Sequence, residues 1–262
     1  MAYLTLVDGS MSPQSTTDQS TRAFHSLGTR GRSGDGRVYY YAANRVNSAI
    51  EAGKLLLGTA LESTHINQTQ GTSGTGTDSG DTVITLDVGT AAVNLGDYVE
   101  GILAVTDAND EGHRYRISDH TGKAASGGGG QISVTLYDSI ASDWSASTKA
   151  SLVPNLYLDA IDTSTSTSLP VVGVSDTAVT AGSANESHTA AATTIYHYWA
   201  QTWGPASVLI EDTPNRPVPV KPSENDAGAV AARDALTDRI VGDMMGTGVD
   251  GQYHPVFLRI TQ

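Results

Sequence analysis

Residues 98–120 read YVEGILAVTDANDEGHRYRISDH, and this stretch decides the fold class. The runs 98–107 and 113–119 both alternate apolar and polar side chains with a period of two, which is typical of half-buried β-strands. Only five residues, ANDEG, separate the two runs. Because a parallel pair needs a crossover of a dozen or more residues, the two runs are expected to form an antiparallel hairpin.

Similar runs lie on both sides of this hairpin. TVITLDV at 82–88 precedes it, and QISVTLYD at 131–138 follows it after the Gly-rich loop HTGKAASGGGG. The four runs predict a β-meander, since consecutive strands with short connections pair antiparallel. A second hairpin is expected at 238–260, where two β-like runs flank GTGVDGQ. The sequence therefore predicts a mainly β protein, with an antiparallel β-sandwich or a barrel-like domain.

The remaining segments are less periodic. TIYHYWAQTWGPASVLIE at 194–211 is expected to form an aromatic strand pair broken at Gly204–Pro205. One or two short helices are expected among 46–53, 142–150 and 223–237, where apolar spacing and cap residues favour them.

The chain divides by composition into an N-terminal arm and a β-rich remainder. Residues 1–10 are expected to contain a short strand, and 11–36 are polar and Gly-rich, without a hydrophobic period. Such a segment buries too little apolar surface to offset its conformational entropy, so we expect an extended arm that only a neighbour can order. Residues 37–262 are expected to form one β-rich domain, or two subdomains over 37–160 and 161–262.

The charge balance narrows the class of partner. Asp and Glu number 28 against 15 Lys and Arg, only four of them Lys, which gives a net charge of −13. This argues against binding to nucleic acid, which requires clustered basic side chains. It suits a protein in concentrated salt, where ions screen self-repulsion, although an ordinary acidic protein fits as well. No run approaches the roughly 18 apolar residues of a membrane span, and the absence of Cys excludes disulfides and thiolate metal sites.

Residues 107–112 suggest a loose calcium site. Asp107, Asn109 and Glu111 stand at alternate positions and Gly112 is the sixth residue, as in the calcium loop of an EF-hand. However, the twelfth position is Ser118 where a bidentate Glu is expected. The stronger interpretation is structural, with no cofactor: these residues form the tip and wet face of a hairpin.

The period of the strand 113–119 predicts which side chains face the core. One face carries His113, Tyr115, Ile117 and Asp119. The opposite, solvated face carries Arg114, Arg116, Ser118 and His120.

No catalytic motif occurs in the chain. There is no HExxH, no phosphate-binding P-loop and no GxSxG, so we expect that the protein is not an enzyme. The aromatic side chains of the two Tyr- and Trp-rich strands are expected to contact partner molecules; they are Tyr39, Tyr41, Tyr196, Tyr198, Trp199 and Trp203. Trp199 and Trp203 could alternatively form a platform for sugar stacking.

Several short stretches resemble virion structural proteins of tailed phages and tailed archaeal viruses, of the capsid decoration or cement type. The resembling stretches are GRVYYYA at 36–42, AIEAGKLLL at 49–57, the stretch 98–120, SLVPN at 151–155, TWGPASVLI at 202–210 and HPVFLRI at 254–260. The resemblance implies a β-rich protein made in the host cytoplasm, which binds the major capsid protein on the outside of the virion and forms a homo-oligomer, often a trimer. It implies no catalytic residues.

Two other functions remain open at this point. One is a tail, fibre or vertex turret component, in which Trp199, Trp203 and the loops bind glycans of the host surface. The other is a secreted carbohydrate-binding module or hydrolase, which would need a signal peptide that the chain's first residues do not contain.

Overall fold

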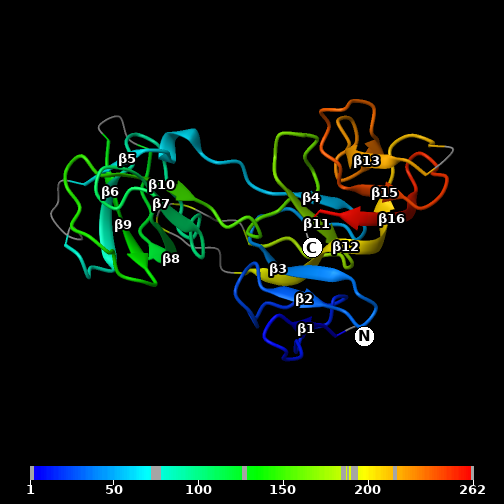
Figure 1. Cartoon of the computed structure of the whole chain (residues 1–262), viewed down its shortest axis with the longest axis horizontal. Helices are drawn as coiled ribbons and strands as arrows, with labels where there is room; N and C mark the ends of the chain where they lie inside the picture. The colour runs from blue at the N-terminus through cyan, green and yellow to red at the C-terminus, as the bar shows by residue number, and fades with distance from the viewer. Residues whose placement is uncertain are drawn as a thin grey trace. The chain divides into compact units, whose positions relative to one another are not determined.

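The computed structural model describes residues 3–71, 78–125, 129–183, 187, 189, 194–214 and 217–260. The chain divides into two compact units (Figure 1). Unit 1 comprises residues 1–60, 156–183 and 194–262, and unit 2 comprises 61–155 and 184–193. The predicted fold class is confirmed, because the described residues form antiparallel sheets in both units. No helix within the described ranges is long and apolar enough to cross a membrane.

Unit 1 is a ten-stranded sheet with the order β1-β2-β3-β12-β16-β15-β13-β14 (Figure 1). Strand β11 also pairs with β12, and β4 pairs with β11. Its strands are β1 (Thr5–Leu6), β2 (Arg30–Arg32), β3 (Val38–Asn44), β4 (Leu55–Leu57), β11 (Val171–Ser175), β12 (Tyr196–Leu209), β13 (Pro219–Pro222), β14 (Val230–Ala232), β15 (Gly242–Met244) and β16 (Tyr253–Arg259). The paired strands of this sheet are antiparallel.

Strand β12 organises this sheet. The expected break at Gly204–Pro205 is wrong, because 196–209 form one continuous strand. Its first half pairs with β3 and its second half with β16. The first β3 residue, Val38, lies opposite Trp203. Pro205 therefore lies beyond the end of β3, and its missing N–H removes no hydrogen bond to that strand.

Unit 2 contains a closed barrel with the strand order β10-β5-β6-β9-β8-β7. Its strands are β5 (Gln68–Gln70), β6 (Val83–Asp87), β7 (Ile102–Asp107), β8 (Arg114–His120), β9 (Gln131–Leu136) and β10 (Lys149–Val153). The alternating residues of these strands fill the interior, among them the fully buried Ile84, Leu86, Leu103 and Ile117. Closure leaves each barrel strand with a neighbour on both sides, which removes exposed sheet edges.

The predicted meander is correct for β7, β8 and β9 but wrong for β6. Strand β6 pairs with β9 and β5 and not with the next strand, β7. The connection from β6 to β7 runs from residue 88 to residue 101. A connection of this length frees the chain from the hairpin pairing that short links impose.

Strand β8 follows the predicted alternation only to its bulge. Tyr115 and Ile117 are buried, while Arg114 and Arg116 point outward as expected. Between Ile117 and Asp119 the pairing with β9 shifts register. Because a bulge inserts one extra residue into a strand, the side chains after it point to the face opposite to the one that the alternation predicts. The expectation is therefore wrong for the last two residues: Asp119 is exposed and His120 is buried. It is also wrong for His113, which precedes β8 and is exposed.

The expected helices are absent from the described residues. The only helical turn among them is a 3-10 helix, η1 (Ser63–His65). Residue Ile50 within 46–53 forms an isolated β-bridge with Val179, and 223–237 contains β14. Cap residues here close turns: the Ser223 hydroxyl accepts hydrogen bonds from the N–H groups of Asn225 and Asp226.

The extended arm is also a wrong prediction for the described part of residues 1–36. These residues pack against their own chain, because β1 and β2 extend the sheet of unit 1 beyond β3 (Figure 1). Leu4 and Leu6 are buried there in a cluster with Tyr39, Tyr41 and Trp199. The neighbour that orders the segment is thus the aromatic face of its own sheet. The subdomain boundary at 160 also differs from the observed division, in which unit 1 is built from three separate parts of the chain.

Candidate functional site

The aromatic residues expected at an interface mostly form the core of unit 1. Tyr39, Tyr41, Tyr198 and Trp199 have no exposed surface, so they cannot contact a partner. This part of the interface prediction is wrong, because a core and an interface select the same aromatic pattern. Tyr196 and Trp203 are half-buried, and Trp203 packs edge-on against Phe257 at 5.4 Å.

The residues of the predicted calcium loop have partners of their own. Asp107 forms an ion pair with Lys149 at 3.3 Å, and the Asn109 side chain donates a hydrogen bond to the carbonyl oxygen of Asp143. Glu111 is exposed. No group of three or more acidic, His or Cys side chains within the described ranges is placed to hold a metal ion. Calcium binding remains a prediction from the sequence.

Asp110, which lies between the predicted ligands, is the polar centre of this region. Its buried carboxylate accepts hydrogen bonds from the Trp144 indole at 3.0 Å, the Tyr115 hydroxyl at 2.9 Å and the Ser142 hydroxyl. Burial opposes ionisation, but the donors outweigh it and lower the pKa of the Asp110 carboxyl. These bonds attach the β7–β8 turn to the segment that precedes β10, so the role of Asp110 is structural.

A second polar cluster lies inside unit 2. The Tyr98 hydroxyl is 2.5 Å from Nδ1 of His65, and the Tyr98 backbone N–H donates to Nε2 of His120 at 3.1 Å. Both histidines are buried. Burial lowers the pKa of His65, and Glu62 partly offsets this effect. The burial of both rings favours a structural role here also.

Unit 1 contains a hollow of about 670 Å³ with a charged wall. Arg37 and Asp176 line it, and their side chains approach to 3.5 Å. The Tyr39 hydroxyl donates to Oδ2 of Asp176 at 2.8 Å, and Nε of Arg37 donates to Asp35 at 2.9 Å. Burial raises the pKa of the Asp176 carboxyl, although Tyr39 and Arg37 act in the opposite direction. Polar groups with perturbed pKa values in a hollow are typical of binding sites.

Tyr253 provides an aromatic wall of the same hollow. Its side chain is 45% exposed, and it stands at the first position of β16. The ring packs on the backbone of Gly53, where a Cβ atom would lie 2.7 Å from it. Gly53 also has a φ of +78°, a conformation that disfavours other residues. Gly53 therefore fixes the position of the ring.

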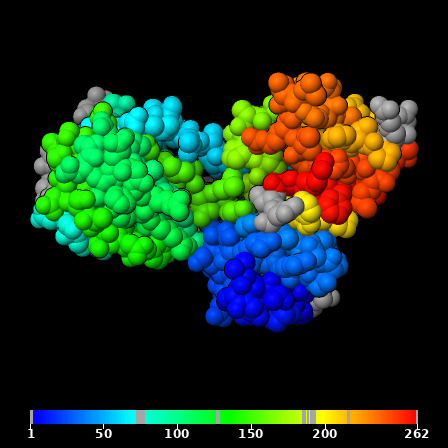
Figure 2. All heavy atoms as spheres, in the orientation of Figure 1, coloured from blue at the N-terminus to red at the C-terminus, as the bar shows by residue number. Residues whose placement is uncertain are grey.

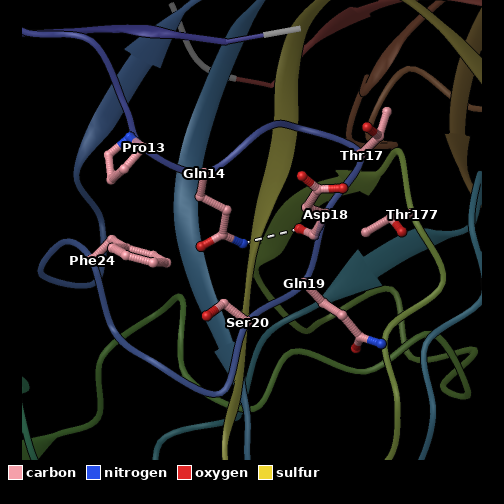
Figure 3. Close-up of a pocket in the computed structure, with 8 residues that line it drawn as sticks. All are labelled: Pro13, Gln14, Thr17, Asp18, Gln19, Ser20, Phe24 and Thr177. Carbon is pink, nitrogen blue, oxygen red and sulfur yellow. Dashed lines mark hydrogen bonds between the residues drawn. The ribbon is translucent and has the colours of Figure 1, made fainter. Parts of the chain in front are cut away.

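A smaller hollow of about 510 Å³ shares Thr17 with the first one. Figure 3 shows its lining, in which Gln14 projects across the loop of residues 13–20 and donates to the carbonyl oxygen of Asp18 at 2.9 Å. The opposite side of the Gln14 amide accepts a hydrogen bond from the Tyr41 hydroxyl. The predicted arm thus forms part of this surface.

The third feature is a segment of unit 1 that exposes large apolar side chains. Within 14 residues these are Leu236 at 93%, Ile240 at 37%, Met245 at 52% and Val249 at 44% of their surface. Leu236 lies in a turn that three hydrogen bonds close: Asp238 N–H to the Ala235 carbonyl, Ala235 N–H to the Asp238 carboxylate, and the Arg233 guanidinium to the Leu236 carbonyl. Figure 2 shows this segment, in orange, on the surface of unit 1.

Comparison with known proteins finds no matching family model, no similar curated protein and no similar solved structure. Sequence reasoning missed the Arg37–Asp176 pair, because its members come from β3's N-terminal flank and from the end of β11, 139 residues apart. It also missed Leu236, which lay in an expected helix. Arg37 next to a Gly-rich turn and Asp176 after a buried strand carry no local signal of pairing.

Proposed function

We propose that this chain is a virion structural protein that binds the outside of a capsid lattice as a homo-oligomer. The exposed, rigidly held Leu236 is the observation that carries the proposal. An exposed leucine alone is ordinary, but this one is the most exposed of four large apolar side chains in one short segment. The turn that holds it lowers the entropic cost of a contact.

The resemblance of the sequence to decoration proteins supports the same function. A stable protein contact buries roughly 1,200–2,000 Å² in total. On a repeating lattice each copy can bind through a smaller area, since an oligomer engages several sites at once. The net charge of −13 also opposes non-specific association between such proteins in the free state.

Copy number in purified particles tests the proposal. We expect the ratio of this protein to the major capsid protein, measured by quantitative mass spectrometry, to be of the same order as one to one. The purified protein is expected to be a homo-oligomer, with a trimer favoured, in size-exclusion chromatography with light scattering. A few copies per particle, or a strictly monomeric protein, would contradict the proposal.

The variant Leu236→Ser locates the contact. We expect at least about a tenfold loss of the protein from particles, since a buried apolar anchor often contributes 2 kcal/mol or more to binding. The thermal stability should not change, because Leu236 is exposed. Leu61→Ser is the matched control, a leucine that is 53% exposed in unit 2; retention of Leu236→Ser at the level of this control would refute the assigned contact.

A further inference from the structure

We propose that the hollow formed by Arg37, Asp176 and Tyr253 binds a neutral saccharide through two neighbouring hydroxyl groups. This activity goes beyond attachment to a lattice and is independent of it, because the hollow belongs to unit 1 of a single chain. It also differs from the sugar platform expected at Trp199 and Trp203, since Trp199 is fully buried.

The polar wall presents a donor and an acceptor side by side. Oδ2 of Asp176 is engaged by Tyr39 and Arg37, whereas Oδ1 accepts no hydrogen bond from the described residues. Arg37 uses Nε for Asp35 and Nη1 for Asp176, and its Nη2 group has no partner within the described ranges. A hydroxyl group both donates and accepts. Two neighbouring sugar hydroxyls can therefore donate to Asp176 and accept from Arg37.

The wall is also rigid before any ligand arrives. The side chains of Arg37 and Asp176 are 24% and 19% exposed, and each is held by a second partner, Asp35 or Tyr39. The guanidinium of Arg37 additionally lies 5.6 Å from the centre of the Tyr39 ring. Groups that are fixed in place lose little entropy on binding, so a small ligand can gain from two or three hydrogen bonds.

The aromatic wall suits the C–H face of a sugar ring. Tyr253 is half-exposed, and the backbone of Gly53 supports one side of its ring. An aromatic ring with one free face and a polar edge favours amphipathic ligands. Ser207, which is exposed, adds a further hydroxyl group to the lining of the hollow.

Local charge favours a neutral ligand. Asp35 and Asp176 oppose a single Arg37, and the whole chain carries −13, so phosphate, sulfate and acidic sugars are repelled. A cationic ligand at Asp176 would meet the Arg37 guanidinium, which lies 3.5 Å from that carboxylate. Neutral hydroxyl groups can donate to Asp176 and accept from Arg37, and neither side chain repels them.

Calorimetric titration of the free, full-length protein tests the proposal without any particle. The probes are maltotriose, cellotriose, lactose and chitobiose, with 3′-sialyllactose as the acidic counterpart. We expect millimolar or tighter binding of at least one neutral probe and weaker binding of 3′-sialyllactose than of lactose. If no neutral probe binds at millimolar concentration, or if sialyllactose binds more tightly than lactose, the proposal is wrong.

Three variants tie binding to the hollow. Tyr253→Ala is expected to weaken affinity about tenfold or more, whereas Tyr253→Phe should retain it, because the ring is what the sugar contacts. Asp176→Asn keeps an acceptor for Tyr39 but replaces the free oxygen with a donor, so affinity should also fall. Tyr137→Ala is the control, at a tyrosine that is 53% exposed in unit 2. Equal affinity of Tyr253→Ala and Tyr137→Ala for the bound probe would overturn the assignment.

Discussion

The barrel of unit 2 and the open sheet of unit 1 use their polar residues in different ways. In unit 2, the buried Asp110 carboxylate accepts hydrogen bonds from Tyr115 and Trp144. The buried His65 and His120 bond to Tyr98. In the sheet, Arg37 and Asp176 line a hollow. Nη2 of Arg37 and Oδ1 of Asp176 form no hydrogen bond with the described residues. The comparison indicates that the barrel's polar groups stabilise a fold, while those of the sheet are available to a ligand.

The two units also differ at the edges of their sheets. The barrel of unit 2 is closed, so it has no edge strand. In unit 1, β1 is covered by residues 10–12 through a bridge between Thr5 and Met11, and β14 is bridged by Ile210. Covered edges prevent uncontrolled strand pairing. Contacts of unit 1 with other proteins are therefore expected to use side chains such as Leu236 rather than an added strand.

The largest expected effect is that of Asp110→Ala in the barrel. The change leaves the Trp144 indole, the Tyr115 hydroxyl and the Ser142 hydroxyl without their shared acceptor. Buried donors without partners cost about 1–3 kcal/mol each, so we expect a loss of roughly 4 kcal/mol of unfolding free energy. Hydrogen exchange measured by mass spectrometry should accelerate in peptides of β7, β8 and β10, and not in those of unit 1.

Asp107→Ala is the control for this prediction. Asp107 is 57% exposed and pairs with a similarly exposed Lys149, so its loss should cost less than about 1 kcal/mol. If both variants accelerate exchange equally, the Asp110 carboxylate does not stabilise the attachment of the β7–β8 turn.

A somewhat smaller effect is expected for Asp159→Ala in unit 1. The Asp159 carboxylate accepts from the backbone N–H of Arg45 at 2.8 Å and from its guanidinium at 2.5 Å. The side chain of Arg45 is only 6% exposed, so the variant removes the carboxylate that pairs with a buried charge, at a cost of about 3 kcal/mol. Exchange should accelerate in peptides of β3 and β11 while barrel peptides stay protected.

The control is Asp243→Ala, which removes an exposed ion pair with Arg259 at 2.6 Å in the same unit. Its effect should be below about 1 kcal/mol. Faster exchange throughout the barrel in Asp159→Ala would show that the two units do not respond separately.

The fold class and the main strands could be predicted because period-two alternation is local. The runs at 82–88, 98–107, 113–119 and 131–138 each overlap an observed strand. Pairing is not local: β6 pairs with β9, and a single bulge in β8 exchanges Asp119 and His120 between faces. No hydrophobic pattern marks a bulge, since the pattern stays alternating on both sides of it.

Sequence patterns did not predict the candidate site either, because its residues are far apart in the chain. Tyr39 was singled out for its aromatic neighbours, yet its function is to hold Asp176, which is 137 residues away. The predicted arm failed because its few apolar residues, Leu4 and Leu6, meet a surface that only the folded sheet creates. Long-range contacts of this kind decide which polar residue is structural and which faces a ligand.

The smallest expected effect is a loss of barrel stability in acid. Burial lowers the pKa of His65 in the folded chain, while an unfolded histidine titrates near 6.5. The unfolded state therefore binds more protons below about pH 6.5, and the free energy of unfolding falls by up to about 1.4 kcal/mol per pH unit for one proton.

Urea unfolding between about pH 7.5 and pH 5 measures this dependence, with barrel peptides followed by hydrogen exchange. In His65→Gln the stability should vary less with pH than in the unchanged protein, whatever its absolute value. His113→Gln is the control, at a histidine whose side chain is 57% exposed. If the pH dependence of the unfolding free energy is the same in all three proteins, the buried His65 does not cause the loss of stability in acid. The polar cluster of unit 2 would then not distinguish its stability from that of the open sheet.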